Sequence, residues 1–473
     1  FILKANPVFD PYRTSGLPEQ GSVIGRPAVG GSGIPSSRQW AFDLPDTGFL
    51  FPGDVLHYYI SATDAIGGVG GSNPQTSLLP PDTTGFSTGF GDPMGYHSLF
   101  TTRALPSIRE DGSGGHEQPE ILFINEFPTQ GDVYEWYTAF NNIGLLVNDD
   151  YDIFFINGSR SSYGNGIGSR ATSLMLTDYN EILYAAGKTY GGWIDQRGIE
   201  TLTEWLDQGG KDIFLTGDEI VNDLNGGTLG QPFLEDVMGV ALATKDVRPF
   251  IDNQTTPLIR AVPGNPVFEG SLQSWIAYGA CDTISTFDGV HTFGTGQSLA
   301  EFTNPAGQAG QYSFSAATLN ILNPGPTQSR AISLPMDLSY IYTDPDVPGN
   351  PLSGRAQLLR DVLMYFGQVG DPENVSPVLP GIPFRVSNYP NPFNPGTTIR
   401  YSLPKTGNLK LSIYNVRGQL VKTLIDGRRP AGADQTIVWD GTDHRGAPVS
   451  AGVYFFEARA GGEVKVQKMA LVK

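Results

Sequence analysis

Cysteine, histidine and charged residues are scarce in this chain of 473 residues. The single cysteine, Cys281, excludes a disulfide within the chain. The five histidines show no metal-binding spacing such as HExxH, so a zinc site is not expected. No apolar run reaches about 18 residues, so we expect no membrane span. The fold must therefore rest on hydrophobic cores, for which 39% hydrophobic residues are sufficient, or on bound ions.

Basic residues are also few, and they are unevenly placed. Lys and Arg number 30 against 48 Asp and Glu. Residues 383–473 hold 13 basic and 6 acidic residues, a net charge of +7, which leaves 17 basic and 42 acidic residues, a net charge of −25, in the remainder. So acidic a body disfavours nucleic acid as a partner. The basic segment is expected either to meet an acidic surface, for example that of a neighbouring copy, or to be simply solvated.

The last ninety residues follow an all-β pattern. Alternating apolar and polar residues over Thr397–Leu403, Leu409–Asn415 and Val453–Ala458 predict half-buried strands, and glycines between these segments supply turns. Several strands with a turn about every ten residues indicate a β-sandwich.

Four motifs in this segment resemble a known family. YPNPFNP, IYNVRGQLVKTL, WDGTDHRGAPVSAGVYF and the terminal KMALVK are similar, in order, to the type A sorting domain of the type IX secretion system. The resemblance implies an immunoglobulin-like fold related to the flagellar hook-cap domain, with the type IX translocon as partner. It also implies an extracellular or outer-surface location on a Gram-negative bacterium. The motif residues are Tyr389, Pro390, Asn391, Pro392, Phe393, Asn394, Pro395, Trp439, Asp440, Gly441, Gly452, Tyr454, Lys468 and Lys473.

A cargo of that system needs a signal peptide, and this chain starts at Phe1 without one. We therefore expect a mature or trimmed product, or the C-terminal part of a longer protein.

The first 105 residues are expected to be β-rich. Pro52-Gly53-Asp54 predicts a turn that begins a strand over 55–62. The segment resembles fibronectin-type or related immunoglobulin-like modules. Residues 106–118, with three glycines among charged residues, are expected to be a linker.

Residues 119–370 alternate between strand and helix patterns, which indicates a three-layer α/β domain with a mostly parallel, flavodoxin-like sheet. Residues 371–382 form a Pro-rich linker. The predicted fold is multidomain α/β plus all-β, with the central sheet flanked by two β-sandwich modules, the second over 383–473. The expected strands are Glu120–Phe127, Tyr151–Gly158, Asn180–Gly187, Lys211–Gly217 and Arg330–Met336, and the expected helices are Val133–Asn142, Ile199–Gln208 and Arg355–Gly367.

The segments ILFINE, TLTEWLDQGGKDIFLTGDEI, PFLEDVMGV, GNPVFEG and RAQLLRDVLMYFG resemble class I glutamine-amidotransferase-like domains. The resemblance implies a nucleophilic Cys at a strand-to-helix elbow. The elbow here reads Gly217-Asp218-Glu219, without Cys or Ser, and is predicted to be catalytically degenerate. A more distant resemblance is to the gingipain-like cysteine protease fold.

Other site chemistry has little support in the sequence. Cys281 and His291 are the available pair for nucleophilic catalysis, in the reverse order of the gingipain-like fold, and a buried structural Cys281 is the alternative. Ca²⁺ is the one cofactor that the sequence suggests. Its ligands would come from oxygen-rich loops, either Asp218 and Glu219 or Asp344 and Asp346.

The sequence favours a secreted or cell-surface, non-catalytic structural or adhesion protein that self-associates or meets surface glycans. The alternatives are a secreted hydrolase, acting on peptides or carbohydrates, and a glycan-binding protein with Trp193 or Trp275 as platforms. Asp82-Thr83-Thr84 and Asp282-Thr283-Ile284 resemble short O-glycosylation sites of the same bacterial group.

Overall fold

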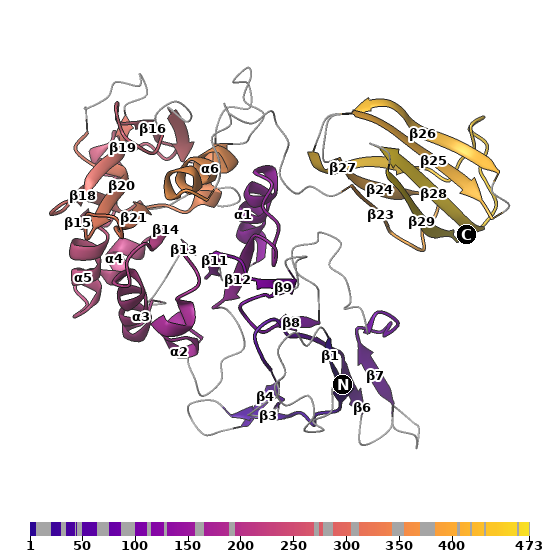
Figure 1. Ribbon diagram of the computed structural model, residues 1–473, viewed down its shortest axis with the longest axis horizontal. Coiled ribbons are helices and arrows are strands. Elements are labelled where there is room, and N and C mark those ends of the chain that lie inside the picture. The colour runs from indigo at the N-terminus through magenta and orange to yellow at the C-terminus, as the bar shows by residue number, and fades with distance from the viewer. Residues whose placement is uncertain are drawn as a thin grey trace. The chain divides into compact units, whose positions relative to one another are not determined.

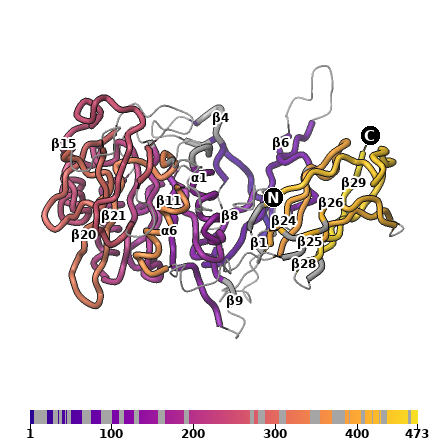
Figure 2. Tube along the Cα trace, turned by 90° about the horizontal axis from the view of Figure 1, so that it is seen from above, coloured from indigo at the N-terminus to yellow at the C-terminus, as the bar shows by residue number. Residues whose placement is uncertain are grey.

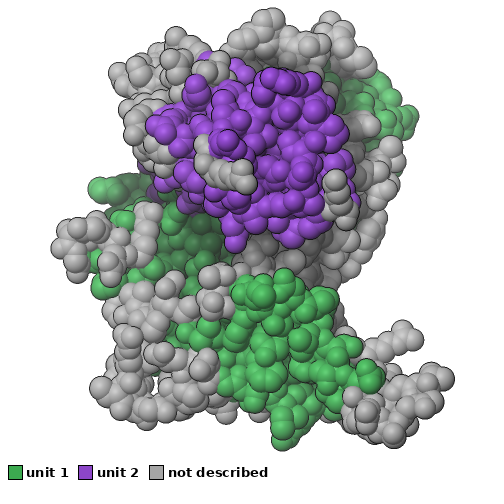
Figure 3. Space-filling view, turned by 90° about the vertical axis from the view of Figure 1, so that its right-hand side faces the viewer, with its two compact units in different colours: residues 1–137, 147–347 green, residues 138–146, 348–473 purple. Residues whose placement is uncertain are grey.

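The structure is a computed structural model in which the chain divides into two compact units. These are residues 1–137 with 147–347, and residues 138–146 with 348–473 (Figure 3). No helix in the described ranges is long and apolar enough to cross a membrane. The finer division into five segments remains a prediction. The described residues are 1–5, 20–29, 35–42, 44, 50–63, 75–86, 100–110, 115–126, 130–156, 165–188, 194–268, 274–277, 287–303, 312–342, 354–368, 384–403, 407–416, 419–429, 432–460 and 463–472.

The N-terminal part of the first unit consists of short antiparallel sheets. Asp54 fixes the turn before the strand Val55–Tyr58 of the main sheet, because its Oδ2 accepts the N–H of Phe51 at 2.9 Å and lies 3.4 Å from Nζ of the buried Lys4. The expected strand over 55–62 is divided at Tyr59, and its two halves pair in different sheets. The strands are β2 (Gln20–Gly21), β1 (Ile2–Ala5), β5 (Val55–Tyr58) and β8 (Thr101–Arg103) in one sheet, and the pairs β3 (Arg26–Val29) with β4 (Pro35–Ala41), β6 (Ile60–Thr63) with β7 (Thr76–Leu79), and β9 (Arg109–Glu110) with β10 (His116–Glu117).

Five parallel strands form the core of the largest sheet (Figure 1). If the strands are numbered along the chain, their order across the sheet is 2-1-3-4-5, which is the flavodoxin-like order. The predicted parallel core is therefore confirmed, and each strand agrees with its expected position to within a few residues. In spatial order the strands are β12 (Tyr151–Phe155), β11 (Ile121–Asn125), β13 (Glu181–Lys188), β14 (Asp212–Asp218) and β21 (Ser329–Leu334).

Beyond β21 the sheet continues with antiparallel strands, which the sequence pattern did not predict. The reason is the connection over residues 323–328, which is too short for the crossover that a parallel neighbour requires. The added strands are β20 (Ser315–Leu322), β19 (Gln297–Thr303), β16 (Leu258–Ala261), β17 (Ser274–Ala277) and β22 (Ile341–Tyr342), with β18 (Gly289–Thr292) pairing β20 and β15 (Val240–Thr244).

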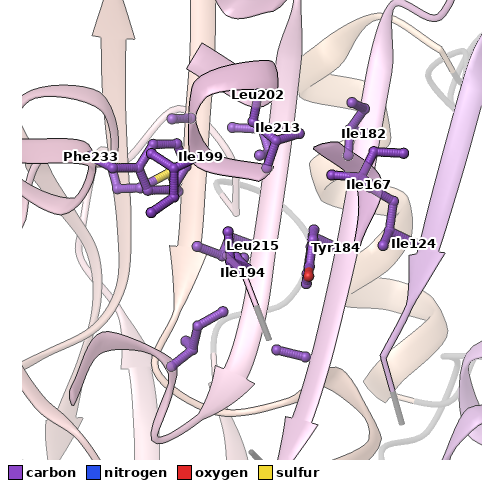
Figure 4. Packing of buried hydrophobic residues seen from close by; sticks show 14 of the residues in the cluster. Ile124, Ile167, Ile182, Tyr184, Ile194, Ile199, Leu202, Ile213, Leu215 and Phe233 are labelled. Atoms are coloured by element: carbon purple, nitrogen blue, oxygen red, sulfur yellow. The ribbon is translucent and has the colours of Figure 1, made fainter. Parts of the chain in front are cut away.

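Helices cover both faces of the parallel core, so the domain has three layers. Ile213 and Leu215 of β14 point into a cluster with Ile199 and Leu202 of α3 (Figure 4). Phe214, between them in sequence, contacts the opposite layer through α1. The helices are α1 (Gln130–Asn142), α2 (Ile167–Arg170), α3 (Gln196–Leu206), α4 (Ile220–Leu224) and α5 (Gly230–Pro232), with single turns at η2 (Ser173–Leu176), η3 (Phe233–Val237), η4 (Arg248–Phe250) and η5 (Leu338–Tyr340).

A buried carboxylate joins the layer of α1 to the sheet. The ring of Trp136 in α1 lies 6.2 Å from that of Phe214, and its Nε1 donates to Oδ1 of Asp337 at 3.0 Å. Oδ2 of Asp337 accepts the hydroxyl of Thr216 on β14 at 3.0 Å. Burial raises the pKa of Asp337, although these hydrogen bonds oppose the rise.

The segment expected as the first linker is anchored where the structure describes it. Ser107 is buried, and its backbone N–H donates to Oδ2 of Asp152 on β12 at 2.9 Å. The same carboxylate oxygen accepts the hydroxyl of Tyr179 at 2.6 Å. This end of the N-terminal segment is therefore fastened to the sheet.

The C-terminal module is a sandwich of two antiparallel sheets, orange to yellow in Figure 2, as predicted. Their inner faces share one core around the fully buried Trp439. Helix α6 (Gly354–Phe366) precedes the module in the second unit. The sheets are β23 (Arg385–Tyr389), β24 (Thr397–Leu403) and β27 (Gly432–Trp439), and β26 (Leu420–Arg429), β25 (Gly407–Asn415), β28 (Gly452–Ala460) and β29 (Glu463–Leu471).

Candidate functional site

The turn from β14 into α4 has the backbone geometry of an elbow. Glu219 lies at its tip with φ 66° and ψ −2°, in the left-handed region that residues other than glycine seldom adopt. Gly217 permits the close approach of β13, because a Cβ at this position would lie 2.7 Å from Cβ of Ala186. A strained turn of this kind exposes the nucleophile in many hydrolases, and here its tip holds a glutamate.

The side chain of Glu219 is held from within α4. Its Oε2 accepts Nδ2 of Asn222 at 3.1 Å. Glu219 is the residue before the helix, yet it makes no side-chain capping bond. Asp288 caps the helix instead, because its Oδ2 accepts the backbone N–H groups of Val221 and Asn222, both at 3.0 Å.

Two buried carboxyl groups near this turn have raised pKa values. The pKa of Asp288 is raised to about 7, mainly by burial and also by the negative charges of Glu219 and Asp223, while hydrogen bonds from the two backbone N–H groups oppose the rise. Glu126 follows β11 directly, and burial raises its pKa to about 8. A hydrogen bond with Tyr184 opposes that rise, and the charge of Asp223 adds to it. Both groups therefore exchange protons near neutral pH.

These carboxyl groups lie where a ligand site is expected in an open parallel sheet. Glu126 follows the carboxyl end of β11, whose neighbours are β12 and β13, and this is where the strand order reverses. Asp218 closes the carboxyl end of β14 and is fully buried. Sequence reasoning missed Glu126 and Asp288, because nothing in their local sequence distinguishes them from the other acids.

Helices α2 and α3 border an open, polar hollow of about 540 Å³ lined by Ser169, Asp195, Gln196, Arg197 and Glu200. Asp195 caps α3 by accepting the N–H of Gly198 at 2.8 Å. Its carboxylate is thus engaged in holding the helix end.

The structure describes only part of the residues expected to carry other chemistry. Cys281, Asp344 and Asp346 lie outside the described residues, so the thiol pair and the second calcium loop remain predictions. His291 is exposed, stacks on Phe314 with ring centroids 5.1 Å apart, and donates from Nδ1 to the carbonyl oxygen of Ser313 at 2.9 Å. No group of three or more His, Cys, Asp or Glu side chains in the described part of the chain is arranged to hold a metal ion.

The suggested aromatic platform at Trp275 is wrong. Its side chain is only 2% exposed and packs edge-on against Phe268 at 5.4 Å. Trp193 and the Asp282–Ile284 tripeptide lie outside the described residues. The exposed Asp82 accepts the N–H of Thr84 at 2.9 Å and so forms a local turn.

The motif residues of the C-terminal module lie in its core and its loops. Trp439 packs between Phe393 at 5.5 Å and Tyr454 at 5.2 Å. Asn391 bonds with β29 twice, donating to the carbonyl oxygen of Lys468 at 3.0 Å and accepting the N–H of Ala470 at 2.9 Å. Lys473 and the side chain of Tyr389 lie outside the described residues.

The loop after Trp439 is closed by its own side chains. Oδ1 of Asp440 accepts the hydroxyl of Thr442 at 2.6 Å and Nζ of Lys422 at 3.0 Å. These bonds, that of Thr442 first, lower the pKa of Asp440 to about 2. Gly441 has φ 71°, and a Cβ there would lie 2.5 Å from the carbonyl oxygen of Pro395.

Comparison with known proteins agrees with this immunoglobulin-like architecture. The family model of the FlgD Ig-like domain matches residues 395–463. No curated protein gives a significant match. Solved structures with similarity to the chain are dimeric latent PorU from Porphyromonas gingivalis (24% identity, TM-score 0.17, covering 18% of this chain and 9% of that one) and FlgD from P. aeruginosa (26%, 0.14, 16% and 59%). A third is PorZ, a surface component of the type IX secretion system of P. gingivalis (16%, 0.16, 43% and 28%). The chain spans less than two thirds of each of these structures.

Proposed function

We propose that this chain is a secreted or cell-surface structural or adhesion protein without catalytic activity, exported by a type IX secretion system. The observation that carries the proposal is the C-terminal sandwich, which matches the FlgD Ig-like domain over residues 395–463. Its sequence motifs resemble a type A sorting domain. Glutamate at the tip of the β14–α4 elbow, in place of Ser or Cys, supports the non-catalytic role. The fibronectin-type and amidotransferase-like resemblances remain part of the proposal.

Self-association is a further part of this proposal. Residues 383–473 carry a net charge of +7, and the remainder carries −25. Opposite charges of this size favour contact between the basic module of one copy and the acidic body of another, most strongly at low salt. Sedimentation at low and high salt tests this, and a strict monomer at both salt concentrations contradicts it.

The export role is tested in a Gram-negative host that carries a type IX system. The full chain is expressed behind a signal peptide, and its location is compared with that of a chain lacking residues 384–473. We expect the full chain at the cell surface or in the medium and the shortened chain in the periplasm. Trp439→Ala, which removes the centre of the module's core, should behave like the deletion, whereas the exposed Val438→Ala should not. Equal export of the full and shortened chains contradicts the proposal.

A secreted hydrolase is the second candidate, and the raised pKa values of Glu126 and Asp288 near the elbow favour it. Carboxyl groups of this kind serve as general acid and base in glycoside hydrolysis. The test is hydrolysis of casein and of a panel of polysaccharides by the purified chain, with Glu126→Gln and Asp288→Asn as variants. Loss of a measured activity in these variants supports the carboxyl mechanism, and its loss in Cys281→Ala instead supports a thiol protease.

A further inference from the structure

Four aromatic rings gather on the surface where η4 meets β18 and the start of β20. We name the set Phe250, His291, Phe293 and Phe314 the aromatic patch. Phe250 is 57% exposed and Phe293 is 42% exposed, and His291 is also exposed. The ring centroid of Phe314 lies 5.6 Å from that of Phe250 and 5.1 Å from that of His291. Phe293 directly follows β18, and its backbone N–H donates to the carbonyl oxygen of Gly239 at 2.8 Å, which extends the pairing with β15 by one residue. Strand alternation then places its side chain on the same side as that of His291.

The rings of the patch are held in place by the backbone beneath them. The imidazole of His291 is nearly parallel to the ring of Phe314, at 13°, and Nδ1 donates to the carbonyl oxygen of Ser313. Gly289 leaves room for Phe314, because a Cβ there would lie 3.2 Å from Cδ1 of that ring. A ligand that stacks on these rings therefore loses little entropy in ordering them.

The exposed rings of the patch lie beside fully buried residues. The backbone N–H of Val247 donates to the carbonyl oxygen of Phe287 at 2.8 Å, and neither side chain has exposed surface, whereas Phe250 and Phe293 remain exposed. Adjacent exposed aromatic side chains with no part in a core are typical of binding surfaces.

The charged side chains beside the patch balance one another. Arg248 binds Asp246 through two parallel hydrogen bonds, of 2.9 Å from Nε and 2.8 Å from a terminal nitrogen. The hydroxyl of Tyr312 donates to Asp252 at 2.5 Å. With Lys245, residues 245–252 hold two charges of each sign. These groups retain hydrogen-bonding capacity without a net charge.

We propose that the aromatic patch binds a neutral polysaccharide. A sugar ring has an apolar C–H face, which stacks on an aromatic ring, and a rim of hydroxyl groups, which bond with Asp246, Arg248 and Asp252. Acidic polysaccharides and anionic membranes are disfavoured, because the body of the chain carries a net charge of −25. The inference rests on the proposed adhesion role and gives it a ligand class.

The test uses the purified full chain and named probes. Binding to insoluble cellulose and chitin is measured by pull-down, and binding to xyloglucan, galactomannan and dextran by affinity electrophoresis, with heparin as the anionic comparison. We expect binding to at least one neutral polymer and not to heparin. Phe250→Ala with Phe293→Ala should weaken that binding about tenfold or more, because two stacking surfaces are lost. The control is Phe42→Ala, which removes a ring of similar exposure, 46%, from the N-terminal segment.

Three results overturn the inference: no binding of the unaltered chain to any neutral polymer, binding that the double variant retains, or binding to heparin alone. A change in sedimentation of the double variant, with polysaccharide binding unaltered, assigns the patch to a protein contact and also overturns it. Thermal unfolding shows that the double variant is folded, as expected for exposed positions. The export experiment is independent of this assay, so the two proposals fail separately.

Discussion

Asp288 caps α4 by accepting the backbone N–H of Val221, although 67 residues separate the two in the chain. Its Oδ2 lies 3.0 Å from the backbone nitrogen of Val221, in the first turn of the helix that follows the strained residue Glu219. The start of the helix is therefore capped by a residue that directly precedes β18, far from the elbow in the sequence. Two predictions concern this contact and the neighbouring buried acid.

Replacing Asp288 by alanine removes the acceptor of the buried N–H of Val221 and of the partly buried N–H of Asn222. We expect a loss of about 1–3 kcal/mol in the free energy of unfolding. Asp288→Asn keeps an oxygen acceptor of the same shape and should cost less. Urea denaturation followed by tryptophan fluorescence measures both. Equal losses in the two variants would show that capping is not the reason for the effect.

Glu126 should make stability depend on pH. Its pKa rises from 4.5 in the unfolded chain to about 8 in the folded one. Within that window the folded chain keeps a proton that the unfolded chain releases, so the contribution of this group to stability is lost as pH rises and is constant above about 8. Glu126→Gln removes the titration. As pH rises from 4.5 to about 8, the free energy of unfolding of the variant should increase by roughly 3–5 kcal/mol relative to that of the unaltered chain.

The measurement for Glu126 is urea denaturation of both chains at several pH values across the window. Glu200→Gln, on the exposed side of α3, is the control and should run parallel to the unaltered chain. If the free energies of unfolding of Glu126→Gln and the unaltered chain differ by the same amount at every pH, the raised pKa of Glu126 is contradicted.

Gly217→Ala should destabilise the chain because β13 and β14 cannot separate at this point. The new Cβ would lie 2.7 Å from Cβ of Ala186, and the expected cost is about 1–3 kcal/mol. Gly21→Ala is the control, since no atom lies within 4 Å of the added Cβ. Thermal unfolding compares the two variants. A melting temperature for Gly217→Ala equal to that of the control would refute close packing at the elbow.

Trp439→Ala should disrupt the C-terminal module alone. The side chain is fully buried between Phe393 and Tyr454, and its removal is expected to cost about 3–5 kcal/mol. Limited proteolysis should then cleave the module faster while the first unit stays resistant. Val438→Ala, at a position 62% exposed on the same strand, should leave the cleavage pattern unchanged.

The parallel strands and the C-terminal sandwich were predictable from the sequence, because each element carries a strong local pattern. The run over Ile121–Asn125 is buried throughout, and Thr397–Leu403 alternates as a half-buried strand does. The antiparallel part of the central sheet was not predictable. The strand Leu258–Ala261, for example, is short, and its partner Gln297–Thr303 lies far away in the sequence.

The candidate sites were less accessible to sequence reasoning than the fold. The elbow residues are contiguous, so Gly217, Asp218 and Glu219 were found. The cap from Asp288 depends on a contact across 67 residues. The aromatic patch joins rings from three separate elements, and no local signal links Phe250 to Phe314. Trp275 differs from these rings because its side chain is buried. Whether a particular aromatic residue is buried cannot be predicted from its residue type alone.

Asn391 joins the first loop of the C-terminal module to its last described strand. Its side chain holds the backbone at Lys468 and Ala470, so this loop is fastened by β29. A chain shortened before Lys468 lacks both partners, and Phe393 loses the carbonyl of Ala470 as well. The first loop of the module is therefore held only when β29 is in place, so folding of the module cannot be complete before this strand has paired.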